Sequence, residues 1–436
     1  MHHCRRCKDL PIVWLSSSLE HLSLYKMESL TTLCRNIDVE AAADSTPPRI
    51  FPKLKAMELV DLPEFERWTE SSTAEMNGSV LFPKLEKLTI SDCNKLATLP
   101  ESPILKYLYV ADYETAEPSS RRSMCMPLGF LASLVCLEIR LSLDVVMPPD
   151  GQRSGRPLET LRNLKLRVDA FLSIFNESKL RLGLGDCLAF VEELDIQECS
   201  NIVRWPLEEL GCLPHLRSLS IGHCSKLEGK GTSSVEEEIL PLPLLKILTV
   251  RSCKSLLDMP QLPTSLEKVE ISFCTSLVAL PSNLGNLAKL RDIAVRDSGA
   301  LKVLPDGMDG LTSLGRLSIR RCPGIEGFPQ GLLQRLPALN YLQIQDCPDL
   351  QRRCREGGEY FDLVSSIPNK DIPAASEPEI QKPQCLTIVH IWQAPDRGKS
   401  WQHCECSHGS DELQYWGGDV TCSCKEIARA EAWDEA

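Results

Sequence analysis

Residues 266–281 read LEKVEISFCTSLVALP, and this stretch decides the fold because it recurs along the chain. Close copies are LEKLTISDCNKLATLP at 85–100, VEELDIQECSNIVRWP at 191–206, LKILTVRSCKSLLDMP at 245–260 and LGRLSIRRCPGIEGFP at 314–329. The shared frame is L-x-x-L-x-L-x-x-C-x-x-L-x-x-L-P, numbered here as positions 1 to 16, with Ser298 once in place of the cysteine. A further full copy with Ser298 begins at Leu290, shorter copies begin at Leu216 and Leu339, and weaker ones at Leu19, Leu54, Leu105, Leu134 and Leu161, which makes thirteen units.

The spacing of these units indicates a repeat architecture. From Val191 to Leu339 the frame advances six times in 148 residues, a mean step of about 25 residues. Leucine-rich repeats have periods of about 20–29 residues, and stacked units bury the apolar face that one unit leaves open. We therefore expect an α/β fold, a leucine-rich-repeat solenoid curved as a horseshoe. Its concave face should carry a parallel β-sheet, and its convex face should be irregular or short-helical.

Each position of the frame has a physical role. Leucines at positions 1, 4 and 6 should point inward, and the L-x-L pair has the period of a β-strand. The cysteine at position 9 is expected to turn the chain under the strand, packing as a small hydrophobe while its thiol acts as a weak donor. Seven of the 20 cysteines share this position, so we interpret them as structural. Disulfides would need an oxidising compartment, and zinc would need four ligands in one cluster.

The composition narrows the function classes. The 436 residues are 43% hydrophobic and 25% charged, as in an ordinary folded chain, and the net charge of −12 argues against broad nucleic-acid binding. No run of about 18 apolar residues occurs, so no membrane span is expected. The first residues, MHHCRRCK, lack the apolar core of a secretory signal, which predicts the cytoplasm or the nucleus. The eight histidines are scattered and no nucleophile frame surrounds them, so we expect no enzyme and no cofactor.

Two charged patches are predicted on the concave face, where positions 3, 5, 7 and 8 should point outward from strands about 4.8 Å apart. The acidic strand comprises Glu192, Glu193, Asp195 and Glu198. The basic ribbon comprises Arg251, Lys268, Arg296, Arg316, Arg320 and Arg321, with Phe273 and Tyr341 among them. Arginine and aromatic residues are enriched at protein interfaces, which favours protein binding here. The alternative is a solvated surface on which Asp292 and Asp297 partly neutralise the arginines.

The last 64 residues break the pattern. We expect residues 1–372 to form the array of about thirteen units with a C-terminal cap, and 373–436 to be a linker and a poorly ordered tail rich in Trp and Cys. Two C-x-C pairs in this tail are weak candidates for a zinc site, because C-x-C is tighter than the usual C-x₂₋₄-C knuckle. Their residues are Cys404, Cys406, Cys422 and Cys424. The sequence therefore predicts no metal site.

Several segments resemble one known family. The run FPKLKAMELVDLPEFERW at 51–68, followed by Phe82-Pro83 in a second Phe-Pro-x-Leu unit, is similar to the C-terminal repeats of plant nucleotide-binding leucine-rich-repeat (NLR) disease-resistance receptors. The opening C-x-x-C-x-x-L-P at 4–11 and the close CPDLQRRCREGGEYFDLVSSIPNKDI at 347–372 resemble that family's neighbouring unit and terminal cap. Tyr360-Phe361 replaces the family's Asp-Trp. The resemblance covers residues 4–372.

The resemblance implies a function in plant defence. In that family the repeats sense pathogen molecules and contact the receptor's own nucleotide-binding domain. The phosphate-binding motif G-x-x-x-x-G-K-[ST] does not occur here, which leaves a truncated receptor, a partial gene model or a stand-alone repeat protein as alternatives. A stand-alone adaptor such as a ubiquitin-ligase substrate receptor would need an N-terminal helical motif, and none precedes Leu10. An extracellular receptor would need a signal peptide and usually has asparagine at position 9.

Overall fold

The computed structural model describes residues 4–8, 10, 18–34, 51–69, 82–96, 99–100, 102–112, 122–125, 133–140, 143–146, 159–168, 170–175, 188–229, 239–373, 390–393, 400–403, 412–414 and 421–423. The chain divides into two compact units, Met1–Pro373 and Ala374–Ala436. The first unit contains all thirteen copies of the frame.

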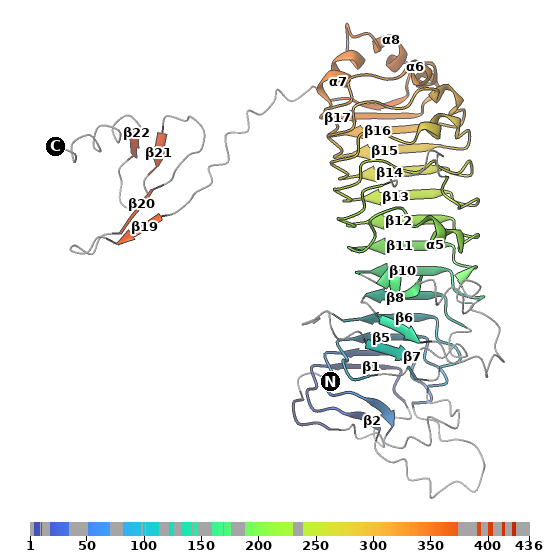
Figure 1. The fold of residues 1–436 in the computed structure, drawn as a ribbon, viewed down its shortest axis with the longest axis vertical. Helices are drawn as coiled ribbons and strands as arrows, with labels where there is room; N and C mark the ends of the chain where they lie inside the picture. The colour runs from blue at the N-terminus through green and yellow to red at the C-terminus, as the bar shows by residue number, and fades with distance from the viewer. Residues whose placement is uncertain are drawn as a thin grey trace, which may run out of the picture. The chain divides into compact units, whose positions relative to one another are not determined.

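One parallel sheet of 14 strands runs through the first unit, and each copy of the frame supplies one strand (Figure 1). In sheet order the strands are β1 (His21–Tyr25), β3 (Ala56–Val60), β5 (Lys87–Ser91), β6 (Tyr107–Ala111), β8 (Cys136–Arg140), β10 (Asn163–Arg167), β11 (Glu193–Gln197), β12 (Ser218–Gly222), β13 (Ile247–Arg251), β14 (Lys268–Ser272), β15 (Asp292–Arg296), β16 (Arg316–Arg320), β17 (Tyr341–Gln345) and the cap strand β18 (Asn369–Asp371). The predicted leucine-rich-repeat solenoid with a parallel sheet is confirmed.

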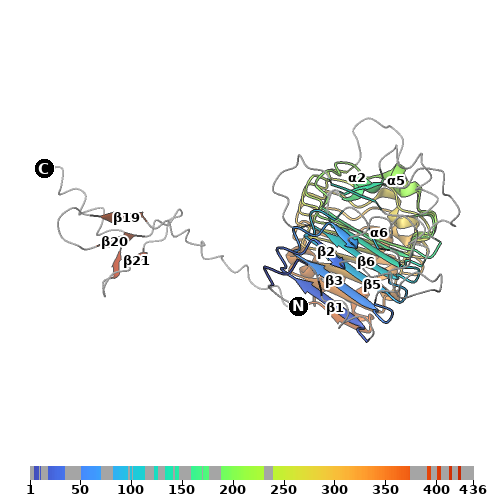
Figure 2. The same cartoon turned by 90° about the horizontal axis from the view of Figure 1, so that it is seen from below.

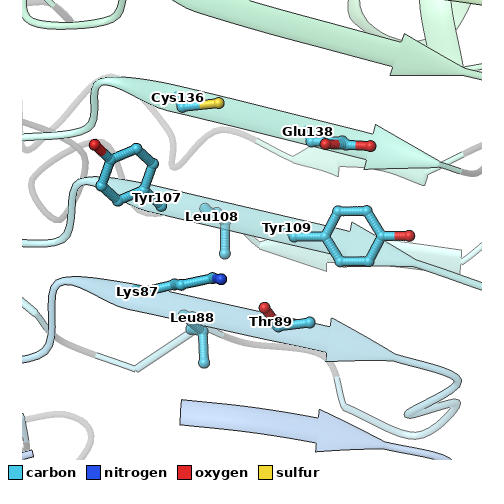
Figure 3. Close-up of a pocket in the computed structure, with 8 residues that line it drawn as sticks. All are labelled: Lys87, Leu88, Thr89, Tyr107, Leu108, Tyr109, Cys136 and Glu138. Atoms are coloured by element: carbon cyan, nitrogen blue, oxygen red, sulfur yellow. The ribbon is translucent and has the colours of Figure 1, made fainter. Parts of the chain in front are cut away.

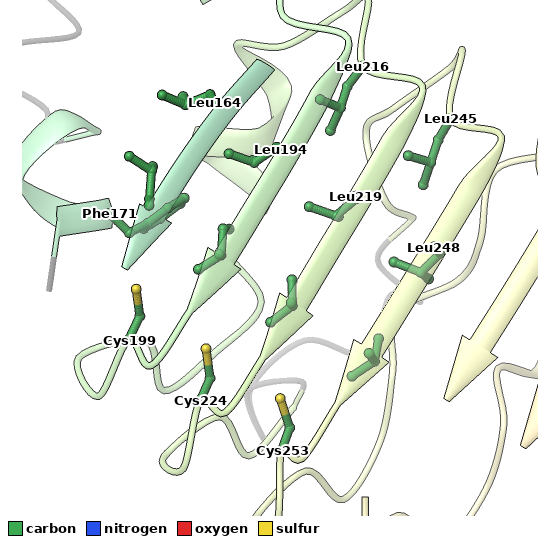
Figure 4. Packing of buried hydrophobic residues seen from close by; sticks show 14 of the residues in the cluster. Leu164, Phe171, Leu194, Cys199, Leu216, Leu219, Cys224, Leu245, Leu248 and Cys253 are labelled. Atoms are coloured by element: carbon green, nitrogen blue, oxygen red, sulfur yellow. The ribbon is translucent and has the colours of Figure 1, made fainter. Parts of the chain in front are cut away.

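The register of the sheet follows the frame. Every repeat strand spans positions 3 to 7, and equal positions pair across neighbouring strands, as Leu194 with Leu219 and Leu219 with Leu248. The leucines at position 4 therefore stack in a row, as Leu194, Leu219 and Leu248 do in Figure 4. The residues at position 6 pair in the same way, as Ile196 with Ile221. These side chains are almost wholly buried, and full burial of one such side chain contributes about 1.5–3 kcal/mol. The sheet thus has one apolar inner face and one outward face, which carries positions 3, 5 and 7.

The turn after each regular strand lies one residue earlier than predicted. The residue at position 8 has a positive φ, between 49° and 60°, in all seven units from β11 to β17. Its left-handed backbone ends the strand and directs the next residue inward, whereas the sequence predicts the turn at position 9. Glu198, Phe273 and Arg321 therefore lie on the rim beyond the strand ends.

The cysteines at position 9 form a buried spine beneath these turns, and Figure 4 shows three of them in a row. The Cys322 thiol donates to the carbonyl of Arg320, two residues back, at 3.2 Å and contacts the carbonyl of Val295 on the preceding strand at 3.9 Å. Cys347 makes the same pair of contacts, and the Ser298 hydroxyl donates to the Arg296 carbonyl at 3.1 Å. The prediction of a structural, weakly donating residue at this position is confirmed.

Short helical segments connect several of the strands. They lie across the core from the sheet (Figure 2). In chain order the helical segments are α2 (Ala170–Ile174), α5 (Leu207–Gly211), η6 (Ser282–Asn286), η7 (Met308–Gly310), α6 (Gln330–Arg335) and η8 (Leu336–Ala338). Two small parallel pairs also form, β2 (Thr32–Cys34) with β4 (Arg67–Thr69), and β7 (Arg122–Cys125) with β9 (Leu143–Val146). The short-helical return predicted from the sequence is confirmed.

The segments that resemble the known family pack buried aromatic side chains near both ends of the array. Phe51, Phe65, Trp68 and Phe82 are fully buried, and Trp68 meets the rings of Phe65 and Phe82 edge-on at 5.4 and 5.8 Å. At the other end, α7 (Pro348–Cys354) and α8 (Phe361–Ser365) form the cap, where Tyr360 is buried.

The second unit contains two antiparallel pairs among its described residues. They are β19 (His390–Gln393) with β20 (Ser400–His403), and β21 (Glu412–Gln414) with β22 (Thr421–Ser423). The proposed division at residue 372 and the poorly ordered character of this tail stay predictions.

Candidate protein-binding face

The basic ribbon forms one surface at the C-terminal end of the outward face. Its position-7 arginines are ladder partners, Arg296 with Arg320, while Arg251 is separated from Arg296 by the small residue Ser272. In the position-3 column, Arg316 lies between Asp292 and Tyr341. The register therefore brings the predicted residues together on β13 to β17, with Phe273 and Arg321 on the adjacent rim.

A carboxylate that the sequence reasoning missed lies in the middle of this surface. Glu270, at position 5 of β14, has a side chain only 12% exposed. Its oxygens lie 3.1 Å from Arg251 Nη2, 3.4 Å from Lys268 Nζ and 3.8 Å from Arg296 Nη1. One carboxylate thus faces three cations of the basic ribbon, and that cluster carries a net charge of +2.

Two further cations of the ribbon have single acidic partners. Arg316 lies 3.7 Å from Asp292 and stacks over the Tyr341 ring at 5.4 Å from its centroid. Arg321 forms a two-pronged hydrogen bond with Asp297, which raises the pKa of the guanidinium above its ordinary value. The predicted partial neutralisation by Asp292 and Asp297 is therefore present in the structure.

Arg320 differs from the other five cations. Among the residues that the structure describes, its guanidinium has no carboxylate within ion-pair distance and makes no hydrogen bond. Its Nε atom is buried without an acceptor, and so is the Nε atom of its ladder neighbour Arg296. The small residues of this face, Ser272, Ala294 and Ser318, are no more than 5% exposed, so longer side chains shield them.

The aromatic members of the ribbon differ in exposure. Phe273 is 48% exposed, whereas Tyr341 is half-buried beneath Arg316. A half-exposed phenylalanine beside cations is a surface that a partner could cover, since aromatic residues and arginine are enriched at protein interfaces.

The acidic strand is neutralised more than its sequence indicates. Glu192 precedes β11 at position 2, on the opposite rim, where it lies 3.3 Å from both Arg162 and Arg217. Glu198 pairs with Arg140 at 3.2 Å. Glu193 accepts a hydrogen bond from Asn163, and Asp195 accepts one from Gln197 at 2.6 Å. Arginines thus neutralise two of the four carboxylates, and the other two accept hydrogen bonds from neutral amides.

A hollow of about 380 Å³ lies on the outward face of β5, β6 and β8 (Figure 3). Tyr107 and Tyr109 rise from β6, with Lys87 on one neighbouring strand and Glu138 on the other. Tyr107 is 49% exposed, and burial raises the pKa of the Cys136 thiol beside it. The sequence reasoning missed this site because it compared columns only in the regular half. Two outward tyrosines at positions 3 and 5 of one strand were the available signal.

The tail cysteines lie beyond what the structure describes. Cys404, Cys406 and Cys424 are outside the described residues, and for Cys422 only its place in β22 is known. Within the described ranges no cluster of three or more His, Cys, Asp or Glu residues could hold a metal ion. None of the helices in those ranges has the length and apolarity that crossing a membrane requires.

The sheet, the frame and the spine define the class of this chain, which is that of leucine-rich-repeat solenoids. No family model matches it. Its relatives are plant disease-resistance proteins, so the resemblance inferred from the sequence is confirmed. Disease resistance protein RPP4 of Arabidopsis thaliana is 29% identical over 129 residues, covering 28% of this chain and 11% of that protein.

Two further relatives from the same plant match other lengths of the array. Disease resistance protein RPP5 is 33% identical over 26% of this chain and 8% of its own length. Disease resistance protein RML1A is 33% identical over 40% of this chain and 17% of its own length. The chain thus spans less than a fifth of each of these three relatives.

Solved structures match over most of the array at low identity. The crystal structure of the TLR13–ssRNA13 complex is 15% identical, covers 82% of this chain and 64% of that one, and has a TM-score of 0.33. The mouse RP105/MD-1 complex is 14% identical with the same coverage and a TM-score of 0.31.

Proposed function

We propose that this chain is a recognition module of plant defence, which binds another protein through the basic ribbon and performs no chemistry itself. The partner is a pathogen protein or a nucleotide-binding domain that the repeats restrain, and the chain acts in the cytoplasm or nucleus. The kinship with disease-resistance proteins supports the setting.

One observation carries the proposal. Six cations converge on β13 to β16 and the rim beyond them, and the acidic side chains among them leave an excess of positive charge. A half-exposed phenylalanine stands beside them. Solenoids use such extended faces for binding, and a charged face accelerates association with a partner of opposite charge.

Charge reversal tests the proposal. The variant combines Arg296→Glu, Arg316→Glu and Arg320→Glu. Its matched control reverses Lys226, Lys254 and Lys302, which are exposed on the turns that follow the strands and change the net charge equally. Both variants and the wild-type chain are immobilised and exposed to extract from infected leaves and to a recombinant nucleotide-binding domain of a disease-resistance protein.

The expected result is a protein that the wild-type chain and the control retain and the ribbon variant loses. The affinity of the purified partner for the wild-type chain should fall as the salt concentration increases from about 0.05 to 0.5 M, because salt screens the attraction between exposed charges. A partner whose affinity and salt dependence are the same for all three chains would place binding on another surface and overturn the proposal.

A further inference from the structure

The ladder neighbours Arg296 and Arg320 share a condition that Arg335 also has but without such a neighbour. In each guanidinium the Nε atom is shielded from solvent and, within the described ranges, has no hydrogen-bond acceptor. An unsatisfied buried donor destabilises a protein, and the effect is larger for a charged group. Two such groups lie on adjacent strands in register, and a ligand with acceptor atoms would complete both.

The surroundings define what that ligand must be. The nearest carboxylate, Glu270, is 3.8 Å from Arg296 and is already shared with Arg251 and Lys268. Beside the pair, the small residues Ala294 and Ser318 are both 4% exposed, and Ser318 gives its hydroxyl proton to Gln343. The pair thus offers only donors and positive charge, and a complementary ligand has acceptor oxygens and negative charge.

We infer that Arg296 and Arg320 form a seat for one oxyanion, a carboxylate or a phosphoryl group, carried by the acidic segment of a protein partner. The guanidinium is a planar fork that matches both groups with paired hydrogen bonds. Part of the Arg296 side chain is exposed, at 38%, so its guanidinium can turn to meet the ligand. The unsatisfied Nε donors of the free protein favour that turn. This inference rests on the proposed function for its partner, but the seat itself can be tested with a small anion.

The test uses inorganic phosphate and the full chain. Arginine Nε–H signals are followed by NMR as phosphate is added, with chloride at equal ionic strength as reference. The variant Arg296→Lys with Arg320→Lys keeps every charge and loses the two forks, and it also assigns the two signals. The control Arg321→Lys removes a fork that Asp297 already occupies.

We expect phosphate, and not chloride, to shift the two signals in the wild-type chain and in the control. The double variant should bind phosphate about tenfold more weakly or worse, as loss of charge-assisted hydrogen bonds requires. Peptides that differ only in Glu, phosphoserine or Gln then identify the source of the oxyanion, with the Gln peptide inactive.

Equal effects of phosphate and chloride, or equal phosphate binding by the double variant, would overturn the seat. If phosphate fails while a protein partner still depends on the basic ribbon, this inference falls and the proposed function stands. If phosphate binds the pair but no partner depends on the ribbon, the seat stands and the proposed function falls.

Discussion

Replacing Glu270 by Gln should weaken the fold while strengthening the positive charge of the basic ribbon. The change removes one negative charge and keeps the size of the side chain, so packing beneath the strand is preserved. Arg251, Lys268 and Arg296 then face one another without the carboxylate that now lies 3.1 to 3.8 Å from each of them.

The magnitude follows from the exposure of the four groups. Removing one partner of a fully buried pair destabilises a protein by about 3–5 kcal/mol, whereas an exposed pair contributes about 0–1 kcal/mol. Glu270 is 12% exposed, but its three cations are between 38% and 52% exposed, so solvent screens much of the attraction. We expect the free energy of unfolding to fall by about 1–3 kcal/mol at low salt.

Urea unfolding followed by circular dichroism measures this loss at 0.1 M and 1 M NaCl. At 1 M salt the Debye length is about 3 Å, so the difference from wild type should shrink by roughly half. The control is Glu267→Gln, whose carboxylate pairs with Lys246 on the exposed rim and should give no measurable change. If the Glu270 variant had the same free energy of unfolding as wild type at both salt concentrations, Glu270 would not stabilise the fold by offsetting the repulsion among these cations.

Three further predictions concern the spine and the cap. Ser298→Cys should raise the free energy of unfolding by about 0.5–1 kcal/mol in urea, because a thiol keeps the donor and buries more apolar surface; Ser298→Ala should lower it. Burial raises the pKa of Cys274 to about 11 and those of Cys347 and Cys354 to about 12, so each thiol binds its proton more tightly in the folded state. The contribution of these thiols to the free energy of unfolding is complete below the unfolded pKa of about 8.5. It is lost as the pH rises toward the folded pKa values, by about 1.4 kcal/mol per thiol and pH unit. A urea midpoint that stays constant from about pH 8.5 to 10.5 would contradict this. Gln351→Leu should destabilise the cap by about 1–3 kcal/mol, because the Gln351 amide accepts a hydrogen bond from the Cys347 N–H and donates one to the Pro373 carbonyl. Hydrogen exchange should show this loss of stability first in α7 and α8.

The frame predicted the strands well because its signals are local. A period of two in L-x-L and a step near 25 residues require only that neighbouring units stack alike, and thirteen copies became thirteen strands. The turn at position 8 escaped prediction because its residues share no type: Asp297 and Asp346 favour a positive φ, whereas Glu198, Phe273 and Arg321 do not. Stacking imposes that backbone on them.

The candidate site was predicted less completely than the fold. Its residues could be named from their columns, but the state of each charge depends on the reach of side chains across strands. Glu270 lies at position 5, between the two columns, positions 3 and 7, that contain the cations. The register of β13, β14 and β15 places Arg251, Lys268 and Arg296 around its carboxylate. A comparison of position 5 across the strands would have exposed this carboxylate.

The contacts of the cysteine spine have a consequence for how the array fails. Four thiols at position 9 join their own strand end to the strand before it, as Cys274 does with Ser272 and Val250; the others are Cys93, Cys322 and Cys347. Contacts of this kind couple nearest neighbours and nothing beyond them, so the units behave as links in a one-dimensional chain. A destabilising change in one unit should weaken its two neighbours, and the effect should become smaller further along the array. An array built this way can accumulate substitutions on one stretch of its surface while the rest of the solenoid keeps its shape.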